Sequence, residues 1–125
     1  MSRWNFKQKP DLSILIPAHN EKAGLAQLLP EIDRMLAGWS DRPATEIILI
    51  DDGSVDGTAE AISHLQLLHT TICYFRQPTR QGQSTALAQA VAMAEGEWLA
   101  TLDADGQNDP ADLPRLWALA NQGND

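Results

Sequence analysis

Four short apolar runs alternate along the chain with four longer segments in which apolar residues recur at helical spacing. The runs, each predicted to be a buried β-strand, lie at residues 12–16, 46–50, 71–75 and 98–102. The segments with helical spacing, each predicted to be a helix, lie at residues 25–36, 58–68, 84–95 and 110–121. Nearly continuous apolar strands joined by crossover helices form parallel sheets that are covered on both faces. The pattern therefore predicts an α/β domain with the order βαβαβαβα.

Turn-forming residues predict where several of these elements begin and end. Pro17 is expected to stop the first strand, and Pro30 to kink the first helix or to delay its start. Asp56 or Ser54 is expected to cap the second helix, and Gly96 to close the third.

Composition limits the class of protein. The 125 residues suffice for one small domain, predicted over residues 12–125 after a polar tail at residues 1–11. Nine Lys and Arg against 17 Asp and Glu give a net charge of −8, which disfavours a nucleic-acid partner because phosphate backbones are repelled. The single cysteine, Cys73, excludes a disulfide framework and a zinc site built from several thiolates. No apolar run approaches the roughly 20 residues that a membrane span needs.

Carboxylates gather where the predicted strands end, and ligands bind at that edge of a parallel sheet. The acidic residues at the strand ends are Glu21, Asp51, Asp52, Asp56, Asp103 and Asp105. A divalent cation offsets the repulsion between facing carboxylates, and Asp and Gln oxygens suit Mg²⁺ or Mn²⁺. The spacing of Asp103 and Asp105 is weak evidence alone, because both residues could instead cap a turn and the next helix.

Phosphate chemistry fits this acidic edge if a metal ion is present. The sequence has neither a Gly-x-x-x-x-Gly-Lys-Ser/Thr loop nor a Gly-x-Gly-x-x-Gly fingerprint, which disfavours the ATPase and dinucleotide-binding folds that carry them.

Four strand-end segments instead match a different family. In chain order they are Pro17-Ala-His-Asn-Glu21, Asp51-Asp-Gly-Ser54, Arg76 to Gln83, and Asp103-Ala-Asp-Gly-Gln107. Together, over about residues 12–119, they resemble the Rossmann-like, nucleotide-sugar-binding half of family 2 inverting glycosyltransferases with the GT-A fold. The last segment, with Asn108-Asp-Pro110 after it, is most similar to the polyprenyl-phosphate branch, which uses dolichyl or undecaprenyl phosphate.

This resemblance implies a set of site residues. Contacts with a nucleotide sugar are implied for Pro17, Ala18, Asn20, Glu21, Asp51, Asp52, Arg80 and Asp103. The first four would shape the pocket for base and ribose, while Asp51 places a turn, Asp52 binds the base and Arg80 reaches the phosphates or base region. A Mg²⁺ or Mn²⁺ ion is implied on Asp103, Asp105 and Gln107, with the two aspartates as catalytic residues. Gln83 stands where many relatives have a Lys, and Gly106 where Leu is commoner.

The implied activity is inverting transfer of a sugar from a UDP- or GDP-linked donor to a polyprenyl phosphate or a glycan. A lipid phosphate is anionic at pH 7 and needs no general base. Relatives continue into a further strand and an acceptor-binding half, so the chain is expected to be truncated, to bind donor and metal, and not to turn over. An unpaired sheet edge would then invite self-association. The whole protein is expected at the cytoplasmic face of a membrane, and this part in solution.

Two other classes of protein compete with this interpretation. A receiver-type signalling domain is also acidic and of this length, but it needs a Lys late in the chain, and the last lysine here is Lys22. A nucleotide-binding domain without transfer activity is left open by the sequence. Among the remaining residues, Trp39, Trp98 and Trp117 are expected to pack in the core rather than to bind sugar. His19 could serve loop structure or substrate contact equally well.

Overall fold

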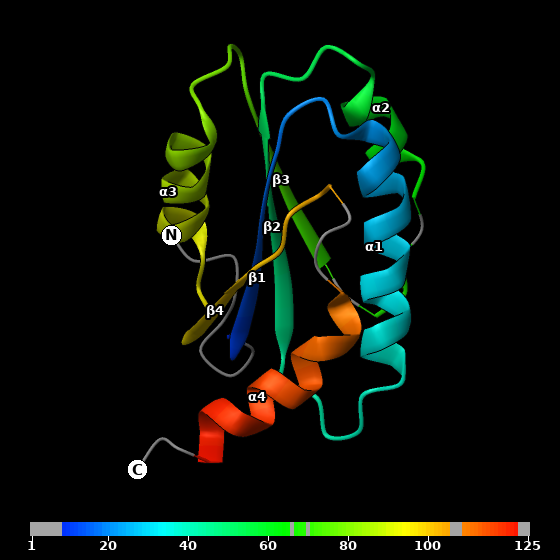
Figure 1. Cartoon of the computed structure of the whole chain (residues 1–125), viewed down its shortest axis with the longest axis vertical. Coiled ribbons are helices and arrows are strands. Elements are labelled where there is room, and N and C mark those ends of the chain that lie inside the picture. Colours follow the sequence, from blue (N-terminus) through cyan, green and yellow to red (C-terminus); the bar gives the residue numbers. More distant parts are fainter. Residues whose placement is uncertain (1–8, 66, 70, 106–108, 123–125) are drawn as a thin grey trace.

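The computed structural model describes residues 9–65, 67–69, 71–105 and 109–122, so most of the predicted tail and Gln107 lie outside the described residues (Figure 1). The four described strands are β1 (Leu12–Ala18), β2 (Thr45–Asp52), β3 (Thr71–Gln77) and β4 (Trp98–Thr101). They form one sheet in the order β3-β2-β1-β4, and every neighbouring pair is parallel. The predicted parallel α/β fold is confirmed.

Helices cover both faces of the sheet. They are α1 (Lys22–Ala37), α2 (Thr58–Ser63), α3 (Gln83–Met93), the short 3₁₀ helix η1 (Pro110–Asp112) and α4 (Leu113–Gln122). Helices α1, α2 and α4 lie on one side of the sheet and α3 on the other (Figure 1). Within the described ranges, no helix is long and apolar enough to cross a membrane.

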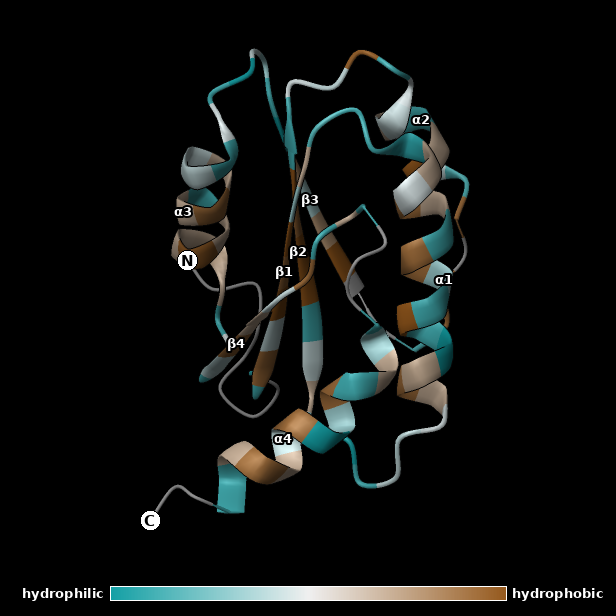
Figure 2. Cartoon of the chain, in the orientation of Figure 1, coloured by the Kyte–Doolittle hydropathy of each residue, from teal (hydrophilic) through white to brown (hydrophobic). Residues whose placement is uncertain are grey.

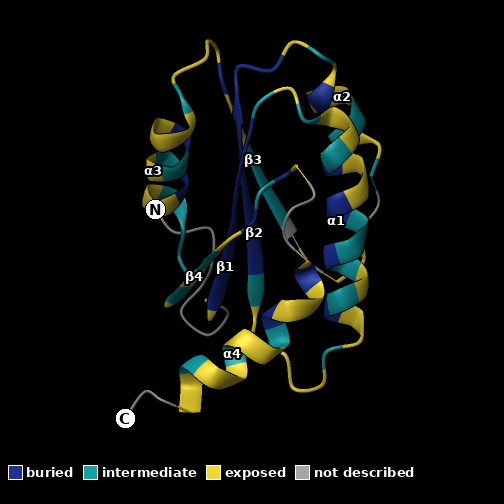
Figure 3. Cartoon of the chain, in the orientation of Figure 1, coloured by how far each residue is buried: buried dark blue, intermediate teal, exposed yellow. Residues whose placement is uncertain are grey.

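Successive residues of the central strands face opposite helical layers, because side chains alternate along a strand. Ile14 and Ile16 pack toward α1, whose buried residues form a stripe turned to the sheet (Figure 2). Leu15 packs toward α3, where Ala86 and Ala90 are fully buried. Small alanines let the α3 backbone lie close to the sheet, and both faces of β1 and β2 are therefore buried (Figure 3).

The first strand and the first helix differ from the predicted bounds. β1 continues through Pro17, which is paired in register with Ile50 of β2. β4 pairs with β1 only as far as Leu15, so that side of β1 is an edge at Pro17, where a missing N–H is tolerated. α1 begins at Lys22 and runs through Pro30, so the predicted late start is wrong.

The second and third helices end earlier than predicted, and the residues that follow them make tertiary hydrogen bonds. The backbone N–H groups of Leu68 and His69 donate to the Asp33 carboxylate of α1, which draws this segment away from a helical path. α3 ends at Met93, and Gly96 is not its closing residue: its N–H donates to the Ser13 hydroxyl at 2.8 Å. A helix cannot continue through a backbone group that is bonded to another strand.

Aromatic packing follows the prediction, but the residue at the N-cap of α2 is Gly57 and not Asp56 or Ser54. Trp117 makes edge-to-face contacts with Trp39 and Trp98, with ring centroids 6.4 and 6.1 Å apart. Asp56 accepts the N–H of Thr58 at 3.2 Å at the start of α2. Its other oxygen accepts the N–H of Lys22 at 3.1 Å, so one carboxylate holds the start of two helices. Burial raises the pKa of Asp56, but its bonds to the Thr58 hydroxyl and the backbone outweigh this and lower the pKa.

Candidate functional site

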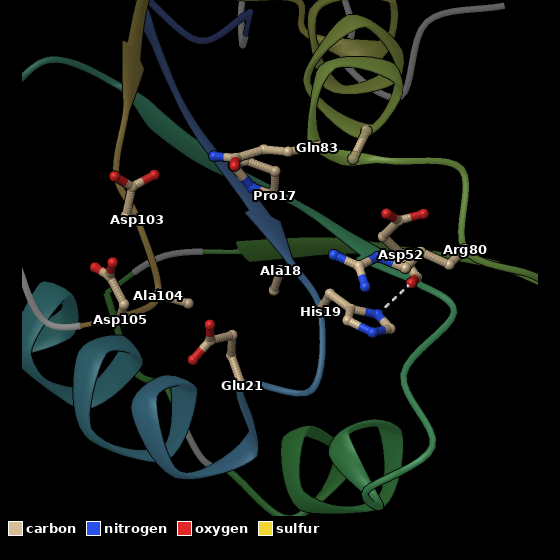
Figure 4. Close-up of a pocket in the computed structure, with 11 residues that line it drawn as sticks. Pro17, Ala18, His19, Glu21, Asp52, Arg80, Gln83, Asp103, Ala104 and Asp105 are labelled. Carbon is tan, nitrogen blue, oxygen red and sulfur yellow. Dashed lines mark hydrogen bonds between the residues drawn. The ribbon is translucent and has the colours of Figure 1, made fainter.

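A cavity of about 260 Å³ opens at the carboxyl edge of the sheet, where the segments after all four strands meet (Figure 4). Its lining residues are Pro17, Ala18, His19, Glu21, Asp52, Arg80, Gln83, Ala86, Asp103, Ala104 and Asp105. Six of the eight predicted substrate residues are among them, while Asn20 and Asp51 are not. The cavity therefore lies at the edge of the sheet where the sequence predicts the ligand-binding residues.

The loop after β1 is held by hydrogen bonds to the loop after β2. His19 donates its Nδ1–H to the backbone carbonyl of Asp52 at 2.7 Å, and its Nε2 faces the Asn20 amide at 3.3 Å (Figure 4). Asn20 has a φ of 51°, a left-handed conformation that asparagine tolerates. Its N–H donates to the Ser54 hydroxyl, and its Oδ1 accepts the N–H of Val55, each at 2.8 Å. Asn20 thus joins two strand ends.

Asp51 is fully buried beside the cavity and holds the turn after β2. Its Oδ1 accepts the N–H of Ser54 at 2.9 Å, and its Oδ2 accepts the hydroxyl of Tyr74 at 2.5 Å. The Nε of Arg76 lies 4.0 Å from the same Oδ2. Burial, followed by the hydrogen bond to Asp51, raises the pKa of Tyr74 well above its ordinary value. A protonated Tyr74 is therefore part of this turn.

Asp52 lines the cavity, yet its carboxylate is 2% exposed and bonded to the loop after β3. Its Oδ1 accepts the Gln77 side-chain amide at 3.1 Å and the N–H of Gln81 at 2.7 Å, and its Oδ2 accepts the N–H of Gly82 at 2.9 Å. A carboxylate has about four acceptor positions, so three of them are used within the protein. Asp52 therefore fixes the loop that carries Arg80.

The loops after β2 and β3 pack backbone to backbone. Gly53 has a φ of 71°, and a Cβ there would lie 2.7 Å from the backbone N of Arg80. Only glycine combines this conformation with so close an approach. Arg80 is exposed and faces the cavity from the side opposite Asp103 and Asp105 (Figure 4).

The loop after β4 supplies the acidic side of the cavity. Asp103 is half-buried, Asp105 is exposed, and Glu21 points toward them from the start of α1 (Figure 4). In the part of the chain that the structure describes, no three His, Cys, Asp or Glu side chains form a metal cluster. Mg²⁺ is commonly held by one or two carboxylates together with substrate phosphates, so this oxygen donor set fits a hard divalent cation with a phosphate ligand. Gln107, the third predicted ligand, lies outside the described residues.

Several lining residues carry no local sequence signal. Ala86 and Ala104 are small side chains that give the cavity its depth, and nothing in a single sequence separates them from other alanines. Gly24 lies in the first turn of α1, and a Cβ there would come within 1.9 Å of the carbonyl oxygen of Ala104. The predicted helix begins at residue 25, so Gly24 lies just outside it and the sequence carries no signal for this contact.

Comparison with known proteins finds the family that the four strand-end segments resemble. The model of the glycosyl transferase family 2 matches residues 13–125. A dolichol-phosphate mannosyltransferase of Mycosarcoma maydis is 30% identical over 96% of the chain, and an undecaprenyl-phosphate 4-deoxy-4-formamido-L-arabinose transferase of Aeromonas hydrophila subsp. hydrophila is 36% identical over 91%. The chain spans 42% and 35% of the length of these two relatives.

Solved structures share the fold. A mannosyltransferase from Pyrobaculum calidifontis, in complex with GDP-Man and Mn²⁺, is 26% identical with a TM-score of 0.68 over 85% of this chain and 31% of its own. S. aureus TarS 1-349 in complex with UDP is 22% identical, with a TM-score of 0.72 over 90% of this chain and 32% of its own. The family model covers nearly the whole chain and the fold agrees, so the chain belongs to glycosyl transferase family 2.

Proposed function

We propose that this chain binds the nucleoside diphosphate of a sugar donor together with Mg²⁺ or Mn²⁺, as the donor-binding part of an inverting glycosyltransferase. The observation that carries the proposal is the cavity at the carboxyl edge, where Glu21, Asp52, Asp103 and Asp105 face one arginine, Arg80. An excess of carboxylates repels a diphosphate unless a cation lies between them. Family membership and the relative that holds GDP-Man and Mn²⁺ support the same assignment.

The lining residues divide by role. Asp103 and Asp105, with Gln107, hold the metal ion, which supplies positive charge to the leaving diphosphate. Arg80 reaches the phosphates, while Pro17, Ala18 and Glu21 form the walls for base and ribose. Asp51 and Asn20 act by holding the loops, as their hydrogen bonds indicate. Asp52 has one acceptor position left for the base beyond its three bonds to the loop.

The start of α3 offers a second contact for phosphate. Gln83, its first residue, lines the cavity, and no side chain caps this helix. The first N–H groups of a helix favour anions, so α3 can contribute where many relatives use a lysine. Arg80 lies on the loop that leads into α3 and lines the same cavity.

The reaction of the whole protein is sugar transfer with inversion. An acceptor oxygen bonds to the anomeric carbon while the bond from that carbon to the diphosphate oxygen breaks. We propose a polyprenyl phosphate as acceptor, in line with the names of the similar curated relatives. Such a phosphate attacks as an anion and needs no general base. Because this acceptor is a membrane lipid, we place the whole protein at the cytoplasmic face of a membrane.

Calorimetric titration of UDP and GDP, with and without Mn²⁺, tests donor binding. We expect one of the two to bind only with Mn²⁺, and Asp105→Ala to weaken it at least about tenfold, or roughly 1.4 kcal/mol. Asp112→Ala is the matched control, because it removes an equal charge from an exposed site outside the cavity. Nucleotide binding that is the same without Mn²⁺ and in Asp105→Ala would overturn the proposal. We expect no sugar transfer by these 125 residues alone, and an assay with radiolabelled donor would detect any transfer.

A further inference from the structure

Gly24 brings the backbone of α1 unusually close to the loop after β4. A Cβ built on Gly24 would lie 1.9 Å from the carbonyl oxygen of Ala104 and 3.1 Å from its carbonyl carbon. Gly24 is the third residue of a regular helix, where alanine is the stronger helix former. Glycine is therefore required at residue 24 by the close approach of the Ala104 carbonyl and not by a special backbone conformation.

The residues on both sides of this contact belong to the cavity. Ala104 is 3% exposed and stands between Asp103 and Asp105. Glu21 precedes Gly24 by one helical turn, and its Oε2 would lie 3.6 Å from the added Cβ. In Figure 4, Glu21 and the Ala104–Asp105 backbone face each other across this gap. The contact thus joins the start of α1, which follows Glu21, to the loop that carries Asp103 and Asp105.

Gly24 and Asp105 also border a groove of about 710 Å³ between α1 and η1. The Ala104 carbonyl against Gly24 limits how far the loop can move relative to α1, since backbone atoms cannot yield as a flexible side chain can. Any side chain at residue 24 would push the loop and the helix apart.

We propose that Gly24 is a positioning residue, which sets the spacing between the Asp103–Asp105 loop and α1 so that Asp103 and Asp105 reach the divalent cation. This inference rests on the proposed function. A Cβ reaches ordinary contact only at about 3.4 Å, so alanine at residue 24 displaces the loop by more than 1 Å. Displacements of about 1 Å at a site can cost two orders of magnitude in function.

Gly24→Ala tests the proposal, with Gly38→Ala as the matched control. Gly38 follows the same helix, and a Cβ there meets nothing closer than the Arg34 carbonyl oxygen at 3.8 Å. The measured quantity is the Mn²⁺ concentration that half-saturates the protein in the presence of UDP or GDP, and the EPR signal of free Mn²⁺ reports it. We expect Gly24→Ala to raise this concentration at least tenfold and Gly38→Ala to change it less than twofold.

A double-mutant cycle separates positioning from a general structural defect. If Gly24→Ala acts through the loop, it adds less than twofold to the effect of Asp105→Asn, because the displaced ligand is already lost. The proposal is overturned if Gly24→Ala weakens Mn²⁺ binding by the same factor in the unaltered chain and in Asp105→Asn. It is also overturned if Gly24→Ala leaves the Mn²⁺ affinity unchanged. If Gly24→Ala no longer unfolds cooperatively in urea, the glycine is needed for the fold and the proposal fails as well. If the unaltered chain shows no Mn²⁺-dependent nucleotide binding, the proposed function itself fails.

Discussion

The acidic residues at the end of β2 and those after β4 flank the same strand, β1, at the same edge of the sheet, but their surroundings differ. Asp51 and Asp52 are 0% and 2% exposed, and their oxygens accept hydrogen bonds from the Ser54 turn, Tyr74 and the loop after β3. Asp103 is half-buried and Asp105 exposed, and both line the cavity. The first pair shapes loops, whereas the second pair can reach a ligand.

The difference teaches that burial decides which of these carboxylates must be held by donors of the protein. Burying a carboxylate is costly unless hydrogen bonds replace water, and backbone N–H groups do so for Asp51 and Asp52. Glu46, at the opposite edge of the sheet, follows the same rule. It is 2% exposed and accepts the Ser13 hydroxyl at 2.7 Å and the N–H of Glu95 at 2.8 Å. Buried acids in this fold therefore hold chain segments together.

The largest effect is expected from Asp51→Ala. The substitution leaves the Tyr74 hydroxyl and the Ser54 N–H without their acceptor in a buried turn. We expect the free energy of unfolding to fall by about 3 kcal/mol, measured by urea denaturation. Asp112→Ala, an exposed site, should change it by less than about 0.5 kcal/mol. A loss below about 1 kcal/mol for Asp51→Ala would show that these bonds add little net stability.

The same chemical change at each strand end compares the two pairs directly. Asp52→Asn replaces one of the two accepting oxygens by an NH2 group, which then faces either the N–H of Gly82 or the donors of Gln77 and Gln81. We expect it to cost about 2 kcal/mol, against less than about 0.5 kcal/mol for Asp105→Asn. Trypsin should also cleave after Arg80 faster in Asp52→Asn, because the loop has lost its anchor. Equal stability losses in the two variants would remove the distinction between the pairs.

The sequence predicts the element order because the apolar pattern is strong, and β1, β2 and α1 show it most clearly. It does not predict the strand order, because crossover helices permit several arrangements of parallel strands. Element ends were missed where a distant residue decides them. Asp33 of α1 holds the N–H groups of Leu68 and His69, at the end of the range predicted for the second helix. The short reach of β4 allows Pro17 to remain in β1.

The site could be predicted in outline, because parallel strands bring their carboxyl ends together. Arg80, Asp103 and Asp105 lie at the cavity as expected. Residue type alone does not separate Asp51, whose oxygens face a buried turn, from Asp52, which reaches the cavity wall. Only the family resemblance does so, because it implies a turn for Asp51 and a base contact for Asp52. That separation depends on side-chain partners from β3, which become neighbours only when the sheet forms.

The smallest effect concerns Tyr74, whose hydroxyl donates to the buried Asp51 carboxylate. Burial and this bond raise its pKa above the value of about 10 expected in the unfolded chain. The neutral form is thus favoured by folding: its contribution is complete below about pH 10 and is lost as the pH rises toward the folded pKa. Tyr74→Phe should cost about 1 kcal/mol at pH 7, and less above pH 10.

Tyr74 is the only tyrosine of the chain, so tyrosinate absorbance reports on it alone. We expect no ionisation near pH 10 in the native protein and normal ionisation in urea, because only the folded chain places the hydroxyl against Asp51. The Asp112→Ala variant should titrate like the unaltered chain. If native Tyr74 ionises at about pH 10, its hydroxyl is not held by Asp51. That result would contradict the role given to Asp51, which is to bind donors of the protein at the end of β2.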